Sequence, residues 1–124
     1  MRYLVPIFAA VALATACSNN DLVSPNRISG RFDLRTLNGA TLPAAINSRI
    51  AVNAEQLTLN DDGTYSDIAS YSDGTSFTEV GYYSVNNNAI SFQDQTDGIN
   101  YSGSISGDVL TEINGSFTSV YQRE

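Results

Sequence analysis

The sequence contains no histidine, no lysine and no tryptophan, and it has a single cysteine among its 124 residues. One cysteine cannot form an internal disulfide, and without histidine the chain lacks the clustered ligands of a zinc site. The Ser-His-Asp, Cys-His and Ser-Lys pairs of nucleophilic enzymes cannot be assembled either. We therefore predict a protein that is not an enzyme and has no catalytic residues, no metal site and no cofactor.

Positive charge is also scarce. Six arginines are the only basic residues against 13 acidic ones, which gives a net charge of −7 and a sequence pI of about 4.2. Nucleic-acid binding needs a clustered basic surface, so we expect no nucleic-acid partner. An acidic, solvated surface instead favours a soluble monomer.

The N-terminal residues have the pattern of a secretory signal. Arg2 supplies a positive start, and residues 4–16 form an apolar run without a charge. This run is shorter than the roughly 20 apolar residues of a membrane-spanning helix. It has the length of the apolar segment of a signal peptide. We predict a helical signal peptide at residues 1–16.

The lone cysteine directly follows the small residues Ala14-Thr15-Ala16. This arrangement resembles the bacterial lipoprotein signal, in which the leader is cut before a cysteine that is acylated on its sulfur and its new amino group. The resemblance implies cleavage after Ala16, lipidation of Cys17 and a lipid bilayer as partner through the acyl anchor. It departs from the usual pattern in having Leu13 one position further from the cysteine. The alternative is a plain secretory signal cut at the same site, which leaves Cys17 as a free thiol.

The residues after the cysteine indicate a location and a tether. In enteric bacteria, a serine in the place of Ser18 lets a lipoprotein pass to the outer membrane. The resemblance therefore implies a protein of the cell envelope, lipid-anchored in the outer membrane and facing the periplasm. Residues 17–28 are mostly polar, which predicts a lipidated cysteine followed by a flexible tether.

The rest of the chain repeats a short strand and a tight reversal. Leu57 and Leu59 alternate with polar residues, and Asp61-Asp62-Gly63 then breaks the pattern before a new strand begins at Thr64. Asp-Gly between two strand-like runs is a strong hairpin signal, because glycine adopts positive φ without a Cβ penalty. Further reversals are expected at Asp73-Gly74, residues 86–88, Asp97-Gly98, Gly107-Asp108 and Asn114-Gly115.

This rhythm predicts an all-β domain at residues 29–124. The short connections favour an antiparallel up-and-down meander of eight or nine strands that closes into a small barrel, with a β-sandwich as the alternative. Alternate turns of a meander share one rim. We expect Asp61-Asp62, residues 86–88 and Gly107-Asp108 at one rim, and Asp73-Gly74, residues 94–98 and Asn114-Gly115 at the other.

Four local features refine this prediction. Residues 28–37 form a half-buried strand with Phe32 and Leu34 on its inner face. Pro43 lacks an N–H, which favours a sheet edge or a connection there. Residues 44–52 are ambiguous between a short helix at their start and a brief strand at their end. Gly81, within a strand-like run, predicts a bulge or a sharp bend.

Several short motifs resemble those of the small bacterial lipocalin-like domain, whose members are often lipoproteins. These motifs are Gly30-Arg31-Phe32, residues 34–39, Leu42-Pro43 and residues 57–65. The lipocalin signature is Gly-x-Trp on the first strand, with an arginine near the last strand that stacks over the tryptophan. The resemblance implies that Gly30-x-Phe32 and Arg123 fill these roles, with phenylalanine in place of tryptophan.

The strand order points to the same pair of residues. The first and last strands of a closed meander must pair, because otherwise both leave unpaired N–H and C=O groups. Phe32 and Arg123 should then meet where the barrel closes. The alternative is that Arg123, one residue from the C-terminus, is frayed and solvated.

Seven tyrosines and five phenylalanines supply an aromatic core, or they line a pocket at the barrel mouth. Asp61-Asp62, Asp94 and Asp97 fall at turns, where aspartate favours local backbone hydrogen bonds over calcium binding or catalytic pairing. No ligand-binding residue can be named from the sequence. We predict a membrane-anchored envelope lipoprotein whose lipocalin-like domain binds a small apolar ligand or a partner protein. The alternative is a structural or interaction lipoprotein with a filled core and no ligand.

Overall fold

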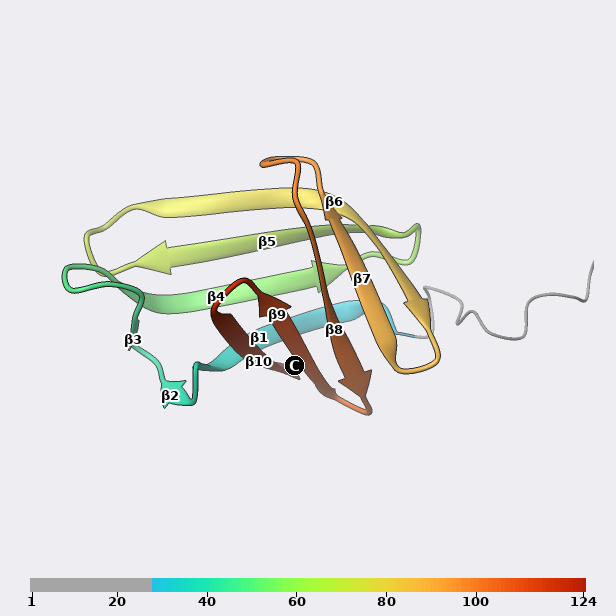
Figure 1. Cartoon of the computed structure of the whole chain (residues 1–124), viewed down its shortest axis with the longest axis horizontal. Helices are drawn as coiled ribbons and strands as arrows, with labels where there is room; N and C mark the ends of the chain where they lie inside the picture. The colour runs from blue at the N-terminus through green and yellow to red at the C-terminus, as the bar shows by residue number, and fades with distance from the viewer. Residues whose placement is uncertain (1–27) are drawn as a thin grey trace, which may run out of the picture.

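The computed structural model describes residues 28–124 (Figure 1), so the predicted signal peptide, Ala16, Cys17 and the tether up to residue 27 lie outside the described residues. The described part is all-β, and it contains no helix with the length and apolarity needed to cross a membrane. Its strands are β1 (Gly30–Leu37), β2 (Ala40–Thr41), β3 (Ala44–Ala45), β4 (Ala51–Leu59), β5 (Thr64–Tyr71), β6 (Ser76–Asn86), β7 (Ala89–Asp94), β8 (Asn100–Ser106), β9 (Val109–Asn114) and β10 (Phe117–Arg123).

Eight of these strands form a closed antiparallel barrel. Each strand from β4 to β10 pairs with the next one along the chain, and β1 pairs with both β10 and β4, which joins the two ends of the sheet. The short strands β2 and β3 lie outside this ring, on the end of β1 and the start of β4. The predicted up-and-down barrel is confirmed, and the sandwich alternative is wrong.

Tight turns alternate between the two rims of the barrel. Every one of the six hairpins from β4 to β10 has a glycine or asparagine with positive φ, the backbone conformation that glycine adopts most easily. Because the strands run up and down, the first, third and fifth of these turns lie at one rim and the others at the opposite rim. The two sets, as predicted, contain Gly63, Asn87 and Gly107 at one rim and Gly74, Gly98 and Gly115 at the other.

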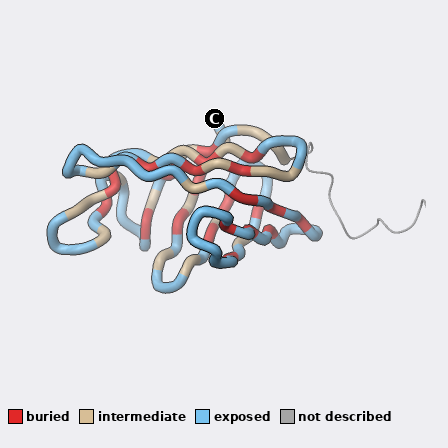
Figure 2. The backbone as a smooth tube through the Cα atoms, turned by 90° about the horizontal axis from the view of Figure 1, so that it is seen from above, coloured by how far each residue is buried: buried red, intermediate tan, exposed pale blue. Residues whose placement is uncertain are grey.

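Side chains alternate between the interior and solvent along the strands, as the banding of buried residues in Figure 2 shows. In β7 the alternation is complete over six residues. Two β-bulges interrupt it elsewhere, one between Leu34 and Thr36 in β1 and one between Val52 and Ala54 in β4. A bulge adds one residue to one strand, so the inward-facing set changes parity across it.

Gly81 does not mark a bulge, one of the two features that the sequence predicted at this position. It pairs in regular register with both β5 and β7. A Cβ atom at this position would lie 2.1 Å from the carbonyl oxygen of Gln93 and 2.9 Å from the ring of Tyr65. Glycine is therefore required because a neighbouring strand and an aromatic ring approach the backbone closely.

The segment between β1 and β4 leaves one end of the barrel open. Pro43 lies in the connection between β2 and β3, as predicted, and β3 rules out the helix alternative for the start of residues 44–52. The pairing of β1 with β4 is confined to residues 30–33 of β1. Beyond that point the two strands diverge and pair with β2 and β3 instead.

Candidate ligand site

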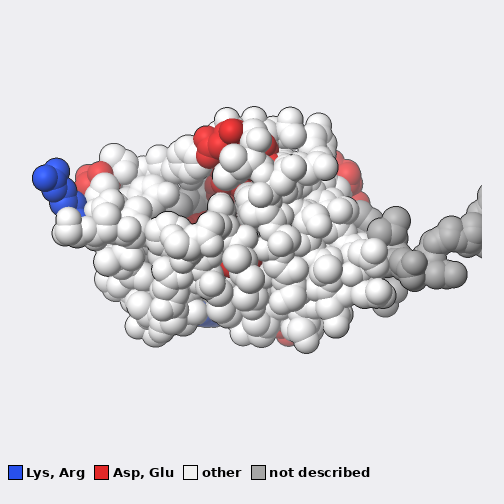
Figure 3. Space-filling view, viewed as in Figure 1, with Lys and Arg blue, Asp and Glu red and all other residues white. Residues whose placement is uncertain are grey.

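The barrel interior contains a cavity at the end opposite Arg123. Leu37 and Ser119 pair at this end of the β1–β10 ladder and both line the cavity, whereas Phe32 pairs with Arg123 at the other end. The cavity volume is about 220 Å³, below the roughly 300–1,000 Å³ typical of pockets for drug-sized ligands. A hollow with Asp and Glu atoms beside and within it is visible in the surface view (Figure 3).

The half of the barrel near Arg123 is filled with apolar side chains. Each strand contributes residues that alternate inward and are packed without solvent contact. The completely buried members of this group are Phe32, Leu57, Ile90, Phe92, Leu110 and Tyr121. The filled core that the sequence offered as an alternative thus describes this half of the barrel, and the cavity occupies the other half.

Three aromatic rings in mutual contact connect the cavity wall, which includes Tyr101, to the filled half, which includes Phe92. The ring of Phe92 lies edge-on to Tyr65 at a centroid distance of 5.1 Å and stacks on Tyr101 at 5.0 Å. Both geometries are favoured between aromatic side chains. The hydroxyl groups of Tyr65 and Tyr101 lie 3.1 Å apart and both donate to Oε2 of Glu79, from Tyr65 at 2.7 Å.

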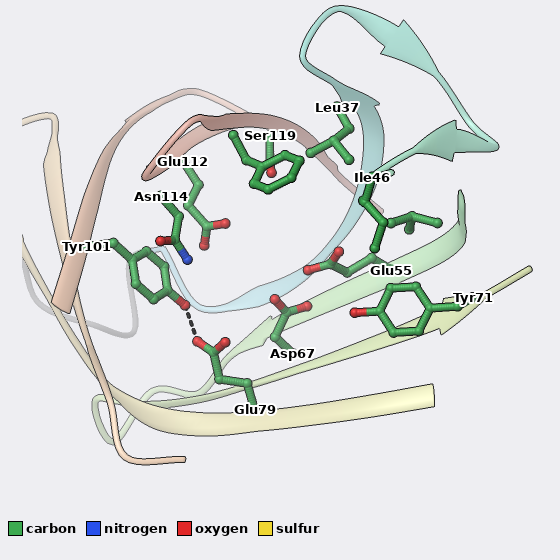
Figure 4. A pocket seen from close by; sticks show the side chains of 12 residues that line it. Leu37, Ile46, Glu55, Asp67, Tyr71, Glu79, Tyr101, Glu112, Asn114 and Ser119 are labelled. Carbon is green, nitrogen blue, oxygen red and sulfur yellow. Dashed lines mark hydrogen bonds between the residues drawn. The ribbon is translucent and has the colours of Figure 1, made fainter. Parts of the chain in front are cut away.

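Four carboxylates from four different strands face the cavity (Figure 4). They are Glu55 on β4, Asp67 on β5, Glu79 on β6 and Glu112 on β9. Asp67 and Glu112 are only 7% and 6% exposed. No basic side chain is among the described residues that line the cavity. The cavity is therefore a small acidic chamber inside an otherwise apolar barrel.

Two of these carboxylates, Glu79 and Glu55, accept hydrogen bonds from tyrosine hydroxyl groups. Glu79 accepts from Tyr65 and Tyr101, and Oε2 of Glu55 accepts from the hydroxyl of Tyr121 at 2.9 Å. By contrast, Oδ1 of Asp67 and Oε2 of Glu112 are buried and have no hydrogen-bond partner within residues 28–124. Buried polar atoms are nearly always hydrogen-bonded in proteins, so these two acceptors mark where a bound donor would be stabilised.

Burial disfavours the charged form of these acids. It raises the pKa of Glu112 to about 8, and the nearby charges of Glu55 and Glu79 act in the same direction, whereas hydrogen bonds with Tyr121 and Tyr101 oppose the shift. Burial also raises the pKa of Asp67 well above its ordinary value, reinforced by a hydrogen bond with Glu55. The pKa of Glu79 is raised by burial too, although the hydrogen bonds from the two tyrosines oppose this shift. When no ligand is bound, the cavity therefore retains protons near neutral pH.

Two of the predicted turn aspartates, Asp62 and Asp94, lie at opposite rims and cap their own turns. Asp62 accepts from the backbone and the hydroxyl of Thr64. Oδ1 of Asp94 accepts from the backbone amides of Thr96 and Asp97 at 2.7 and 3.2 Å. The turn interpretation holds for both residues. Asp94 and Asp97 also approach Glu79, so that one ligand atom from each of the three lies within 4.8 Å of the others.

The sequence-predicted closing pair lies at the other end of the barrel. Phe32 and Arg123 are register partners, and the guanidinium carbon lies 4.6 Å from the ring centroid. Arg123 also donates to the carbonyl oxygens of Ser29 and Ile28 at 2.8 and 3.4 Å and forms an ion pair with Asp108 at 3.1 Å. The arginine is thus held between the first strand, the chain that enters it and the β8–β9 turn.

Sequence reasoning missed the four cavity carboxylates. A usable signal was nevertheless present, because acidic residues occupy inward positions of their strands. Asp67 is two residues from buried Tyr65, and Glu112 is two residues from buried Leu110. A carboxylate at a core position is rarely tolerated without a partner, so this spacing points to a site.

No protein-family model matches the chain, and no curated protein matches it. Solved structures do resemble it. A lipocalin-like protein from Bacteroides uniformis has a TM-score of 0.53 and 18% sequence identity, and the match covers 77% of this chain and 97% of that chain. An uncharacterized protein from Bacteroides eggerthii has a TM-score of 0.53 and 11% identity, with 77% and 98% covered. At these identities the likeness is one of fold. The described domain has a lipocalin-like fold, as the sequence motifs predicted.

Proposed function

We propose that this protein is a lipid-anchored binding protein of the bacterial cell envelope, which holds a small ligand in the cavity of its lipocalin-like barrel. The observation that carries the proposal is the chamber of about 220 Å³ at the open end of the barrel. Its wall includes Asp67 and Glu112, whose buried oxygens lack partners among the described residues. A purely structural domain gains nothing from two buried, unpartnered acceptors, which lower its stability.

The polar side chains of the chamber wall indicate which class of ligand the chamber would bind. The sequence favoured a small apolar ligand, but four carboxylates line the chamber. An apolar molecule there would bury these groups further without offering them a hydrogen bond, which is unfavourable. A ligand with hydrogen-bond donors is the better match.

The position of the chain entry supports a role at a membrane surface. Ile28 and Ser29 are held by Arg123 at the closed end of the barrel, opposite the cavity. An anchor at Cys17 would therefore attach at the closed end and leave the cavity mouth accessible. In this proposal the acyl chains at Cys17 hold the protein in the outer membrane, facing the periplasm, with the bilayer as its partner.

The proposal is one of binding without catalysis. Paired acid and base catalysis needs two carboxylates whose pKa values are shifted in opposite directions. The cavity acids with perturbed pKa values, Asp67, Glu79 and Glu112, are all shifted upward. Shifts in a single direction do not provide the opposed acid and base that such catalysis needs.

Two experiments test the two parts of this proposal. For the ligand, the mature chain is purified from a bacterial host and its intact mass is measured under native conditions. We expect a released small molecule in addition to the protein. A native mass that equals the denatured mass would contradict the ligand-binding role.

For the anchor, Cys17→Ser should move the protein from the membrane fraction to the soluble fraction. The matched control is a Cys17→Ser, Ser24→Cys double variant, which retains one cysteine but not at the processing position, and it should also be soluble. Ser18→Asp should retain the protein in the inner membrane. An unmodified Cys17 in the intact mass of the mature chain would rule out lipidation.

A further inference from the structure

The acidic chamber has a specific charge arrangement. Glu55, Asp67, Glu79 and Glu112 come from four strands and point toward a common space (Figure 4). Histidine and lysine are absent from the chain, and none of its arginines is among the described residues that line the chamber. Within residues 28–124, no cation of the protein itself lines the chamber to compensate these acids.

Two of the acids are incomplete as hydrogen-bonding groups. Asp67 is 7% exposed and Glu112 is 6% exposed, and each has a buried oxygen to which no described residue donates. Both side chains line the chamber, so a group inside it can reach them. Two acceptors that face the chamber from opposite strands of the ring call for a donor with more than one N–H.

We infer that the chamber binds a small organic cation, a primary amine or diamine, whose ammonium group donates hydrogen bonds to Asp67 and Glu112. This inference rests on the proposed ligand-binding function and specifies its ligand class. An alkylammonium group provides three donors and a full positive charge. Charge-assisted hydrogen bonds of this kind are about twice as strong as neutral ones.

The shape of the chamber favours an organic cation over a single metal ion. A metal ion needs ligand atoms that converge on one point. Among the described residues, the three acidic side chains that converge within 4.8 Å are Glu79, Asp94 and Asp97, and of these only Glu79 lines the chamber. The four chamber acids are therefore spread around a volume rather than collected around a point.

The rest of the wall fits the carbon part of an amine. Tyr71, Tyr101 and Phe117 present aromatic rings, and Leu37 and Val52 present aliphatic groups. Aromatic faces attract ammonium groups, and this attraction is strongest where water is excluded. The volume of about 220 Å³ limits the ligand to a short carbon chain.

Binding of an ammonium group should release protons. Burial raises the pKa of Asp67 and of Glu112, the latter to about 8, so both acids hold protons near neutral pH when no ligand is bound. The groups that face them are Glu55 on β4, Glu79 on β6, Tyr101 on β8 and Tyr121 on β10. All of these are acidic or neutral, so the incoming ammonium is the charge that allows ionisation.

The test is titration calorimetry on the purified mature chain in a non-ionic detergent. The probes are butylamine, diaminobutane, butanol, butyrate and calcium chloride, each measured in two buffers that differ in ionisation enthalpy. We expect both amines to bind with proton release, and their affinity to increase from about pH 6 to about pH 8, where Glu112 loses its proton. Butanol and butyrate should not bind.

Two isosteric variants locate the site. Asp67→Asn and Glu112→Gln should each weaken amine binding roughly tenfold or more, because each removes a charge-assisted hydrogen bond. The control is Asp61→Asn at the opposite rim, an exposed residue, which should bind amines as the unmodified chain does. The proton count and pH dependence of the unmodified chain remain decisive if a variant does not fold.

Three outcomes would overturn the inference. Binding of butanol or butyrate without binding of the amines would show that the chamber accepts another class of ligand and would leave the proposed function intact. Calcium binding that is lost in Asp94→Asn, with no amine binding, would replace the amine with a metal ion. No binding of any probe, together with no co-purifying molecule, would overturn both the inference and the proposed function.

Discussion

The guanidinium carbon of Arg123 lies 4.6 Å from the centroid of the Phe32 ring, and the two residues are partners in the β1–β10 ladder. This contact joins the first and last barrel strands at the closed end. Phe32 is completely buried, so the arginine covers the edge of the core while its donors bond the carbonyl oxygens of the entering chain. The pair therefore links closure of the sheet to the position of the N-terminal segment.

Loss of this pair should destabilise the barrel. Arg123→Ala removes a cation–π contact and charge-assisted hydrogen bonds, and we expect the free energy of unfolding to fall by about 2 kcal/mol. Phe32→Ala leaves a cavity in the core and should cost about 3–5 kcal/mol. Urea unfolding monitored by tyrosine fluorescence measures both changes.

The matched control is Arg35→Ala. Arg35 is exposed on the same strand as Phe32, and its loss should change the free energy of unfolding by no more than about 0.5 kcal/mol. If Arg123→Ala is as mild as this control, the arginine does not contribute to barrel closure.

Gly30 should be intolerant of a side chain because of Arg123. Its φ is +145°, and a Cβ atom would lie 2.6 Å from Nη1 of Arg123. We expect Gly30→Ala to destabilise the protein more than Gly98→Ala, since Gly98 also has positive φ but a Cβ atom there would meet no other atom within 4 Å. In an Arg123→Ala background the cost of Gly30→Ala should fall, because the clash is gone and only the backbone strain remains. Additive costs in this double-mutant cycle would argue against the contact.

Most of the barrel topology could be predicted from the sequence, with a β-sandwich as the alternative. Asp-Gly and Asn-Gly pairs predicted the reversals, and the short connections allowed few strand orders other than a meander. The order alone then placed the first strand beside the last, which predicted that Phe32 and Arg123 meet. These inferences succeeded because they depend on local turn chemistry and on the need to pair sheet edges.

Register and close packing could not be read from the sequence in the same way. The bulges in β1 and β4 change the parity of the inward residues, so Leu37 faces inward although Phe32 and Leu34 have the opposite parity. The strand pattern around Gly81 predicts a bulge or a sharp bend, whereas the close approach of the Gln93 carbonyl oxygen on a neighbouring strand is what requires glycine there. Both features depend on tertiary contacts that a single strand pattern does not contain.

The acidic chamber was missed for a different reason. The acidity of the chain favours a solvated surface, whereas Asp67, Glu79 and Glu112 line the cavity. Their inward parity is visible beside Tyr65, Tyr83 and Leu110, but whether their oxygens have partners depends on the whole ring of strands. The many aromatic residues suggested a pocket, but the fold was needed to show that carboxylates line it.

Gly81→Ala provides a test of the close-packing interpretation. The added methyl group would clash with the carbonyl oxygen of Gln93 at 2.1 Å, so the pairing of β6 with β7 must shift. We expect a loss of about 1–3 kcal/mol in the free energy of unfolding, the range for overpacked sites. Ser84→Ala, an exposed position of the same strand, is the control and should be nearly neutral. A Gly81→Ala variant as stable as the control would contradict the close-packing interpretation.

The buried acids predict an unusual pH dependence of stability. Glu112 has a pKa of about 8 in the folded protein and about 4.3 in an unfolded chain. Between these values the folded state holds the proton more tightly than the unfolded state, so the free energy of unfolding falls as pH rises, by at most about 1.4 kcal/mol per pH unit for one group. The raised pKa values of Asp67 and Glu79 act in the same direction. Urea unfolding at about pH 5 and about pH 8 should therefore show a more stable protein at the lower pH, the reverse of a protein held together by ionised acids.

Glu112→Gln should flatten this dependence, because glutamine does not titrate while it retains the shape of the protonated acid. The control is Asp73→Asn. The hydrogen bond from Thr75 lowers the pKa of Asp73, so this residue is ionised in both states above about pH 5 and its loss should leave the slope between the two pH values unchanged. If the unmodified protein is equally stable at both pH values, or if Glu112→Gln retains the full slope, then Glu112 is not a buried, proton-holding acid in the ligand-free chamber. The origin of the slope is therefore decided by these two variants together, since they differ in burial and in the direction of the pKa shift but not in the size of the chemical change.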